Sequence, residues 1–182
     1  MTSRQRIRIR PKSITDAPND YRWQVDPELS DLDATLPLRM EYPDYLEDFR
    51  DQLRYASPDR HTFGVDTVDG KHIGNVVYYN TDFVRRETEV GIMIGERDYW
   101  NQGYGSEAMC ALVDYVFRRT SFKRVYLKTL EKNIRAQRSF QKCGFEPCGH
   151  LTRGGYEFLF MELPRTKWQE RQDREKREAA RQ

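Results

Sequence analysis

The sequence is short of the features that mark metal-binding and disulfide-rich proteins. It has only three cysteines in 182 residues, Cys110, Cys143 and Cys148, and no two of them form a CxxC pair. A zinc site built on cysteine pairs is therefore not predicted, and we expect no metal. An odd number of cysteines cannot all pair with one another, which favours a reducing compartment. We expect Cys143 to pack as a small hydrophobic side chain.

Charge of one sign and long apolar runs are also scarce. The 31 basic and 29 acidic residues leave a net charge of +2, so the composition does not indicate a bulk attraction to nucleic acid. No window approaches the roughly 18 apolar residues of a membrane-spanning helix. The opening "MTSRQRIRIR" lacks the apolar segment of a secretory signal. We therefore expect a cytoplasmic protein with no membrane partner.

The order of the periodic segments predicts one mixed α+β domain. "HTFGVDTV" and "KHIGNVVYYN" read as strands joined by Asp69–Gly70, a pair that favours a type I′ hairpin, and "ETEVGIMIG" reads as a third strand. His61 and His72 flank this hairpin and are expected to be solvated. Further strands are predicted in "RQRIRIRPK", "RVYLKTL" and "YEFLFMEL", and helices in "DAPNDYRWQVD", "YPDYLEDFRDQLRYA", "SEAMCALVDYVFRR" and "NIRAQRSFQKCGF". The last of these helices should stop at Gly144, a natural residue for a helix end.

The composition changes after Pro164. "RTKWQERQDREKREAARQ" is almost wholly polar, with opposite charges spaced four residues apart, such as Glu170 with Arg174. This pattern supports a solvated helix. We therefore divide the chain into a domain at 1–164 and a charged helical tail at 165–182, with only Trp168 to bury.

The stretch "YWNQGYGSEAM" places two glycines where an apolar helix begins, although glycine weakens helix formation by roughly 1 kcal/mol relative to alanine. The first N–H groups of a helix have no partner inside the helix. Glycines let a ligand approach those groups closely, and the helix dipole adds positive charge there. The residues alone leave open a phosphate site or a tight turn. The loop is neither GxGxxG nor GxxxxGK[ST], which removes the main support for dinucleotide folds and P-loop nucleotidases.

Two motifs make the sequence resemble the GNAT superfamily of acyl-CoA-dependent N-acetyltransferases. "QGYGSE" resembles the Q/R-x-x-G-x-G/A signature, with Gln102 and Gly105 in place and Glu107 departing at the last position. That glutamate is common in the branch of ribosomal-protein N-terminal and polyamine acetyltransferases. "NIRAQRSFQKCGF" resembles the helix N-x-x-[AS]-x-x-x-[YL]-x-K-x-G-F. Together with the opening strand and helix, the resemblance spans about Arg6 to Leu163.

The resemblance implies a sheet of about seven mostly antiparallel strands flanked by about four helices, with acetyl-CoA as cosubstrate. The strand residues Met93, Ile94 and Gly95 would pair with the pantetheine arm, and Asn133 would touch the cofactor. The pyrophosphate would bind to the loop residues Gln102, Gly103, Tyr104, Gly105, Ser106 and Glu107. Four basic residues are available for the 3′-phosphate, each of them equally explained as a solvated charge: Arg97, Arg135, Arg138 and Lys142.

Acetyl transfer to an amine requires a neutral nitrogen, and an alkylammonium with a pKa of about 10.4 has roughly one neutral molecule in a thousand at pH 7. A general base is therefore valuable. Glu89 is the first candidate, because its spacing from the loop is similar to that of the catalytic glutamate in relatives, and Glu87 is the second. The alternative reading of Glu89 is a surface residue paired with Arg85 or Arg86.

Other groups complete the expected chemistry. A backbone N–H near Met93 would stabilise the oxyanion, and a pairing break near Gly91 or Gly95 would open the cleft. The tyrosine that often protonates the leaving thiolate in the family is replaced by Phe140. Tyr104 and Tyr156 are the remaining candidates.

The leading hypothesis is therefore acetyl transfer from acetyl-CoA to a primary amine by direct attack in a ternary complex. The alternative is a catalytically silent acyl-CoA sensor, which Phe140 favours, and a nucleic-acid-associated role is the least supported. The acceptor, a protein N-terminus, a polyamine or another small amine, is not identified by the sequence. The region at 29–60 that would select it contains several acids, among them Asp31 and Asp33. A monomer or homodimer is expected.

Overall fold

The computed structural model describes residues 5–55 and 57–181, and in them the chain forms one seven-stranded sheet with helices on both sides. The strands are β1 (Ile7–Pro11), β2 (His61–Thr67), β3 (His72–Asp82), β4 (Glu87–Ile94), β5 (Arg124–Leu130), β6 (Glu146–Arg153) and β7 (Tyr156–Pro164). The α-helices are α1 (Ala17–Gln24), α2 (Pro27–Leu32), α3 (Tyr42–Arg54), α4 (Tyr104–Arg119), α5 (Ile134–Lys142) and α6 (Arg165–Ala179), and two 3₁₀ turns lie at Ile14–Asp16 and Arg97–Tyr99.

The sheet has the order β1-β2-β3-β4-β5-β7-β6, and all neighbouring strands are antiparallel except β4 and β5. The predicted α+β class and strand number are confirmed. The described chain has six α-helices rather than about four, because α2 was not expected and the tail helix α6 is added. Of the pair Asp69–Gly70, only Gly70 has a positive φ (87°), so the predicted type I′ turn is wrong.

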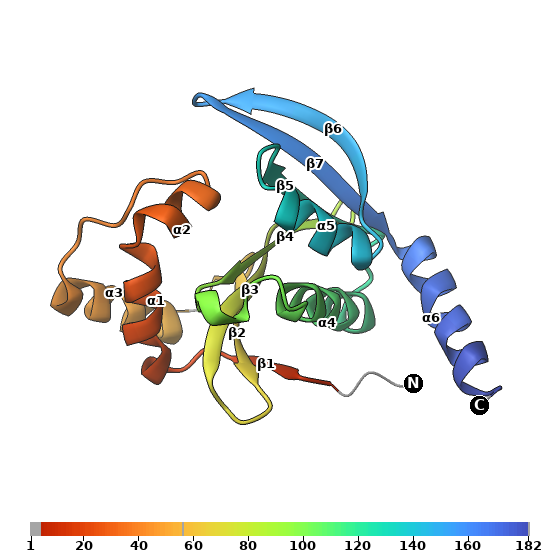
Figure 1. The fold of residues 1–182 in the computed structure, drawn as a ribbon, viewed down its shortest axis with the longest axis horizontal. Helices are drawn as coiled ribbons and strands as arrows, with labels where there is room; N and C mark the ends of the chain where they lie inside the picture. Colours follow the sequence, from red (N-terminus) through yellow and green to blue (C-terminus); the bar gives the residue numbers. More distant parts are fainter. Residues whose placement is uncertain (1–4, 56, 182) are drawn as a thin grey trace.

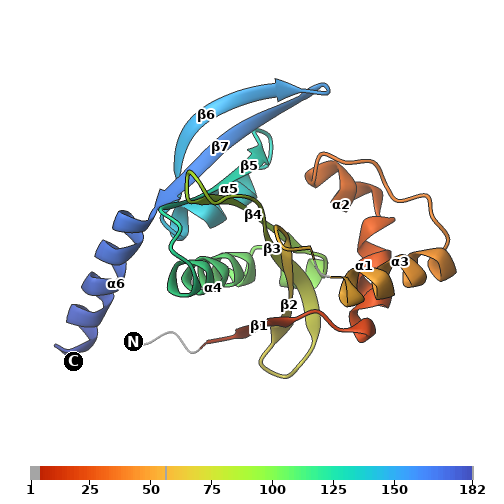
Figure 2. The same ribbon diagram turned by 180° about the vertical axis from the view of Figure 1, so that it is seen from behind.

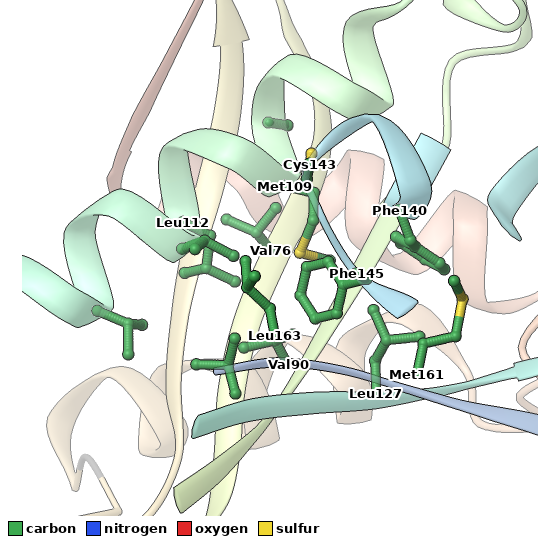
Figure 3. Packing of buried hydrophobic residues seen from close by; sticks show 14 of the residues in the cluster. Val76, Val90, Met109, Leu112, Leu127, Phe140, Cys143, Phe145, Met161 and Leu163 are labelled. Carbon is green, nitrogen blue, oxygen red and sulfur yellow. The ribbon is translucent and has the colours of Figure 1, made fainter. Parts of the chain in front are cut away.

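The helices divide into two groups (Figures 1 and 2). Helices α1, α2 and α3 lie on one side of strands β2 to β4, and α4 and α5 lie on the other. The larger hydrophobic cluster fills the space between α4, α5 and the sheet, where Met109 and Leu112 are fully buried against Val76 and Val90 (Figure 3). The second cluster is small, with Ala17, Tyr45 and Phe49 as its buried members.

Helix α6 extends away from the body of the fold, but its first turns are anchored to it (Figure 1). The Arg165 guanidinium donates to the backbone carbonyls of Phe117, Thr120 and Phe122, at the end of α4 and just beyond it. The indole of Trp168 is 8% exposed and donates to Asp114 at 2.6 Å. The predicted domain boundary at 164 therefore separates two segments that are in direct contact.

Candidate active site

A cavity of about 510 Å³, here the first cavity, opens where β4 and β5 separate. Their parallel pairing runs from Glu87 to Glu89 on β4 and ends there. Beyond this point residues 90–94 and 127–130 line the cavity from its two sides. Pairing with β3 continues without interruption past Gly91 to Ile94. The predicted opening of the cleft is present, and it arises because β4 parts from β5.

The start of helix α4 faces the first cavity. Gly103 is the N-cap residue with a φ of 88°, a left-handed conformation that favours glycine. Gly103, Gly105 and Ser106 line the cavity, and Asn133 lines it at the start of α5. The first N–H groups of α4 have no partners within the helix. The predicted loop therefore presents donors and the positive end of a helix dipole to the first cavity.

Four of the predicted cofactor residues do not line this cavity. Gly95 lies against the Trp23 indole, so closely that no Cβ would fit. The Gln102 amide donates to the Asp98 carbonyl, and Tyr104 packs on the Tyr99 ring. These three residues make their contacts within the protein rather than at the cavity wall.

The fourth of them, Glu107, forms an ion pair with Arg6, just before β1. Glu107 is the position that departs from the motif, and this ion pair connects the residue before β1 to the first turn of α4. The predicted residues that do line the first cavity are Met93, Ile94, Gly103, Gly105, Ser106 and Asn133.

Basic side chains border the first cavity on helix α5. Arg135, Arg138 and Lys142 all line it, and the Arg135 guanidinium lies 3.7 Å from the centre of the Trp100 ring. Arg97 does not line the cavity. Its guanidinium pairs with Asp26 at 2.9 Å and with Glu28 of α2 at 2.7 Å. Three of the four predicted phosphate candidates thus remain near the cavity.

The backbone of β4 presents alternate residues to the first cavity. The Gly95 N–H donates to the Ile73 carbonyl at 3.0 Å, on the β3 side. Consecutive residues of a strand direct their N–H and C=O groups to opposite sides. The backbone groups of Met93 therefore also point to β3, whereas those of Ile92 and Ile94 point to the cavity. The Ile94 carbonyl is occupied by the Trp100 indole N–H at 2.6 Å. The N–H expected near Met93 is therefore better supplied by Ile92.

Glu89 is buried at the point where the two strands part. Its side chain is 3% exposed, and three donors surround it. The Tyr79 hydroxyl donates to Oε1 at 2.9 Å, the Asn80 amide donates to Oε2 at 2.9 Å, and the Lys128 ammonium lies 3.1 Å from Oε1. Glu89 is thus not a surface residue paired with Arg85 or Arg86. Glu87 instead pairs with Arg124 at 2.9 Å.

A β-bulge in β3 helps to assemble the Glu89 cluster. The register of β3 against β4 shifts between Tyr79 and Asp82, and Asn80 takes a φ of 50°. A left-handed conformation is uncommon for a residue other than glycine, and such strain concentrates at functional sites. Burial, followed by the charge and hydrogen bond of Glu89, raises the pKa of Tyr79. No sequence pattern singled out Tyr79, Asn80 or Lys128, because only the fold brings them together.

A second cavity of about 1190 Å³ lies on the opposite side of β4, between the sheet and helices α1 to α3. Several aromatic residues line it, among them Tyr45, Phe49 and Tyr55. Tyr79, Gly91, Ile92, Met93 and Asp33 line both cavities, so the two cavities meet beside Gly91. Of the acids in the predicted selecting region, Asp33 is the one that lies at this junction.

A cluster of buried and half-buried charged side chains lies beside the second cavity, and its ion pairs connect β1 to α1. Arg10 contacts Asp16 and Asp66 at 2.7 Å, and Lys12 contacts Asp20 at 2.7 Å. His72, expected to be solvated, is 9% exposed and packs on the Trp23 ring next to this cluster. The expectation failed because α1 covers the end of the hairpin.

Two further predictions concern α5. Phe140 is buried among core side chains and also lines the first cavity. Cys143 is fully buried as expected, but it forms a disulfide with Cys110 of α4, which the sequence analysis did not assign. The bridge removes the cysteine argument for a reducing compartment.

Tyr104 and Tyr156 do not line the first cavity, so neither is placed there as a proton donor.

Two absences hold within the described ranges 5–55 and 57–181. No group of three or more His, Cys, Asp or Glu side chains could hold a metal ion. None of the helices there is long and apolar enough to cross a membrane.

Comparisons with known proteins agree with this geometry. A family model described as "Acetyltransferase (GNAT) domain" matches residues 6–146. Two curated relatives come from Bacillus subtilis, a probable spermine N(1)-acetyltransferase (32% identical, 37% of this chain) and a spermine/spermidine N(1)-acetyltransferase (36% identical, 38% of this chain). The matched part spans 45% of each relative.

Solved structures share the fold at low sequence identity. A spermidine N-acetyltransferase from Vibrio cholerae, in complex with CoA and spermine, has a TM-score of 0.80 at 18% identity, over 91% of this chain and 99% of that one. An aminoglycoside acetyltransferase in complex with coenzyme A has a TM-score of 0.76 at 17% identity, over 90% and 98%. The chain therefore has the fold of these acetyltransferases.

Proposed function

Because the chain belongs to the GNAT acetyltransferase family, we propose that it transfers an acetyl group from acetyl-CoA to a primary amine by direct attack. The observation that carries this proposal is the meeting of two cavities beside Gly91, where β4 parts from β5. A donor entering from one side and an acceptor from the other would meet there. Direct transfer needs no cysteine nucleophile, which agrees with Cys143 being buried in a disulfide.

We propose that acetyl-CoA binds in the first cavity. The backbone N–H groups at Gly103, Gly105 and Ser106 would hold the pyrophosphate, as amides at a helix start favour anions. Arg138 and Lys142 line the same cavity and would hold a phosphate. The unpaired backbone of Ile92 would meet the extended pantetheine arm. When bound, acetyl-CoA supplies an activated thioester, and the chain supplies orientation and an N–H for the developing oxyanion.

We propose that the acceptor binds in the second cavity, with its amine at the junction. Asp33 would attract the positive charge of the amine or of a neighbouring ammonium, and aromatic faces such as those of Tyr45 and Tyr55 favour cations. A small polyamine is the acceptor that the curated relatives suggest, and an aminoglycoside is the second. Glu89 is the proposed acceptor of the amine proton.

The alternative proposal is a silent acyl-CoA sensor. Its support is Phe140, which lines the first cavity and has no proton to give to a thiolate. A thiolate with a pKa of about 8.5 leaves without a dedicated acid at a modest penalty, so Phe140 does not exclude transfer. A cytoplasmic location, a monomeric or homodimeric state and the lack of a nucleic-acid partner stay predictions.

The deciding experiment measures coenzyme A release from acetyl-CoA with a panel of amines: spermidine, an aminoglycoside and a peptide with a free N-terminus. Transfer predicts release with at least one amine and an acetylated product of matching mass. Acetyl-CoA binding by calorimetry without release on any amine would support the sensor instead. Glu89→Gln is expected to lower kcat by roughly 100-fold, the range of general-base catalysis.

A further inference from the structure

The Glu89 carboxylate is enclosed in a way that does not suit direct contact with an amine. It is 2% exposed as a residue and lines neither cavity. Tyr79, Asn80 and Lys128 occupy both of its oxygens. An ionised carboxylate accepts about four hydrogen bonds, so three of these positions are filled within the protein. An amine would have to displace one of these donors to reach it.

Tyr79 is the one of these donors that lines both cavities. Its hydroxyl hydrogen points to Glu89 Oε1, which leaves the lone pairs of the phenolic oxygen for another donor. Gly91 lies next to this ring, since a Cβ built there would be 3.7 Å from Tyr79 Cε1 and 3.2 Å from Val77 Cγ1, so a larger residue would crowd the junction. An amine at the junction could therefore donate an N–H to Tyr79 while it faces the first cavity.

We propose that Tyr79 is the catalytic residue that contacts the acceptor amine and relays its proton to Glu89. In this step one N–H bond of the ammonium breaks as a new O–H bond forms on Tyr79. The original Tyr79 O–H bond breaks as an O–H bond forms on Glu89 Oε1. The tyrosine ends neutral, the amine is left with its lone pair, and Glu89 holds the proton. The inference rests on the proposed acetyl transfer to an amine.

The surrounding charges fit a relay through a neutral tyrosine. Burial and the negative charge of Glu89 raise the pKa of Tyr79, so the phenol keeps its proton at neutral pH and can pass one on only as it receives another. Lys128 holds the carboxylate in place from β5, and Asn80 holds its second oxygen from the bulge. The Arg60 guanidinium lies 5.2 Å from the centre of the Tyr79 ring and Asp33 lines the same junction, so charges of both signs lie near the ring.

The test combines Tyr79→Phe, Glu89→Gln and the double variant, with spermidine and acetyl-CoA as substrates. Tyr79→Phe removes the hydroxyl and keeps the ring, so acetyl-CoA affinity and the KM for spermidine should stay within about twofold. We expect kcat to fall by about 100-fold in each single variant. Two groups that act as one relay are not additive, so the double variant should be no slower than the slower single variant.

The matched control is Tyr78→Phe, on the same strand one residue earlier, where the ring stacks on His61 and lines neither cavity. It should retain wild-type kcat. A loss of kcat at an unchanged KM for spermidine separates a relay from a structural role.

The outcomes distinguish the inference from the function on which it rests. If the wild type releases no coenzyme A with spermidine or any other amine in the panel, the proposed function fails. If the wild type is active but Tyr79→Phe keeps more than half of its kcat, or the two losses multiply in the double variant, the relay alone is overturned. Circular dichroism and melting curves of each variant confirm that a loss of kcat is not a loss of fold.

Discussion

The two cavities on either side of strand β4 are lined by different kinds of residues. The first includes the glycine-rich start of α4, at Gly103, Gly105 and Ser106, together with basic side chains of α5, and the larger buried core supports it. The second includes several aromatic side chains from α1 and α3 among polar residues, and it lies over a cluster with three buried hydrophobic residues. A constant ligand such as a coenzyme suits the first type of wall, and a variable acceptor suits the second.

The largest effect is expected from the disulfide that ties α4 to α5 on the first side. A cross-link between positions 33 residues apart lowers the conformational entropy of the unfolded chain. This stabilises the folded protein by about 3–4 kcal/mol. We expect Cys110→Ser with Cys143→Ser to lower the free energy of unfolding by that amount, as measured by urea denaturation. Cys148→Ser, at the exposed free cysteine, is the control and should change little. Equal stability of the double variant and the wild type would refute the contribution of the bridge.

The next effect tests the proposed pyrophosphate site at the start of α4. Gly105→Asp places a carboxylate where a pyrophosphate is proposed to bind. Two like charges about 4 Å apart repel by roughly 4 kcal/mol at a surface-like dielectric constant. We expect acetyl-CoA affinity to fall on the order of 100-fold, or about 2.7 kcal/mol, in calorimetry.

Gly105→Ala is the matched control for this substitution. A Cβ at Gly105 would lie 3.5 Å from Ser139 Oγ and 3.7 Å from Ile94 Cγ1, both ordinary contacts, so the fold tolerates it. The alanine variant should bind more tightly than the aspartate variant. Equal binding by all three proteins would place the pyrophosphate elsewhere.

The difference between the two sides also explains what the sequence could predict. The first cavity depends on local signals: glycines at the start of α4, Asn133 at the start of α5 and a strand that leads into the loop. These signals are contiguous in the chain, and the structure places most of the predicted residues on the cavity. Gly95, Gln102, Tyr104 and Glu107 were included because they belong to the motif, but a motif does not show which side chains face a ligand.

The junction between the two cavities depends on contacts between segments far apart in the chain. Tyr79 and Lys128 are 49 positions apart, and Glu89 joins them only because β4 lies between β3 and β5. Periodicity marks a strand but not its neighbours, so the cluster around Glu89 was beyond prediction. The disulfide was missed for the same reason, since Cys110 and Cys143 meet only when α4 packs beside α5.

A smaller effect concerns the charged cluster that supports the second side. Burial opposes the charge of Asp16, but the hydrogen bonds from Arg10 and Ser13 outweigh it and lower its pKa. A depressed pKa in the folded state stabilises the protein above the unfolded pKa of about 3.9, and this contribution is lost as the pH falls below that value. We expect unfolding free energy, measured by urea denaturation, to drop between pH 5 and pH 3.

Asp16→Asn should remove about 2 kcal/mol at pH 7, less than a fully broken buried pair because Arg10 keeps Asp66. It should also flatten the loss below pH 4. Exposed Asp51 on α3 offers the control, since Asp51→Asn should leave both the stability and its pH dependence unchanged. A variant as acid-sensitive as the wild type would assign the acid response to other carboxylates.

The smallest effect is the most informative about the acceptor. Asp33→Asn removes a carboxylate at the junction of the cavities and keeps its shape, so a cationic amine should lose one attractive charge. An ion pair that is partly open to water contributes up to about 1 kcal/mol, which corresponds to a roughly fivefold higher KM for spermidine in steady-state assays. Acetyl-CoA affinity should stay the same. Asp31→Asn is the matched control two residues earlier, because Asp31 pairs with Lys132 and lines neither cavity. A KM for spermidine that is unchanged in Asp33→Asn would show that the second side recognises its acceptor by aromatic contact rather than by charge.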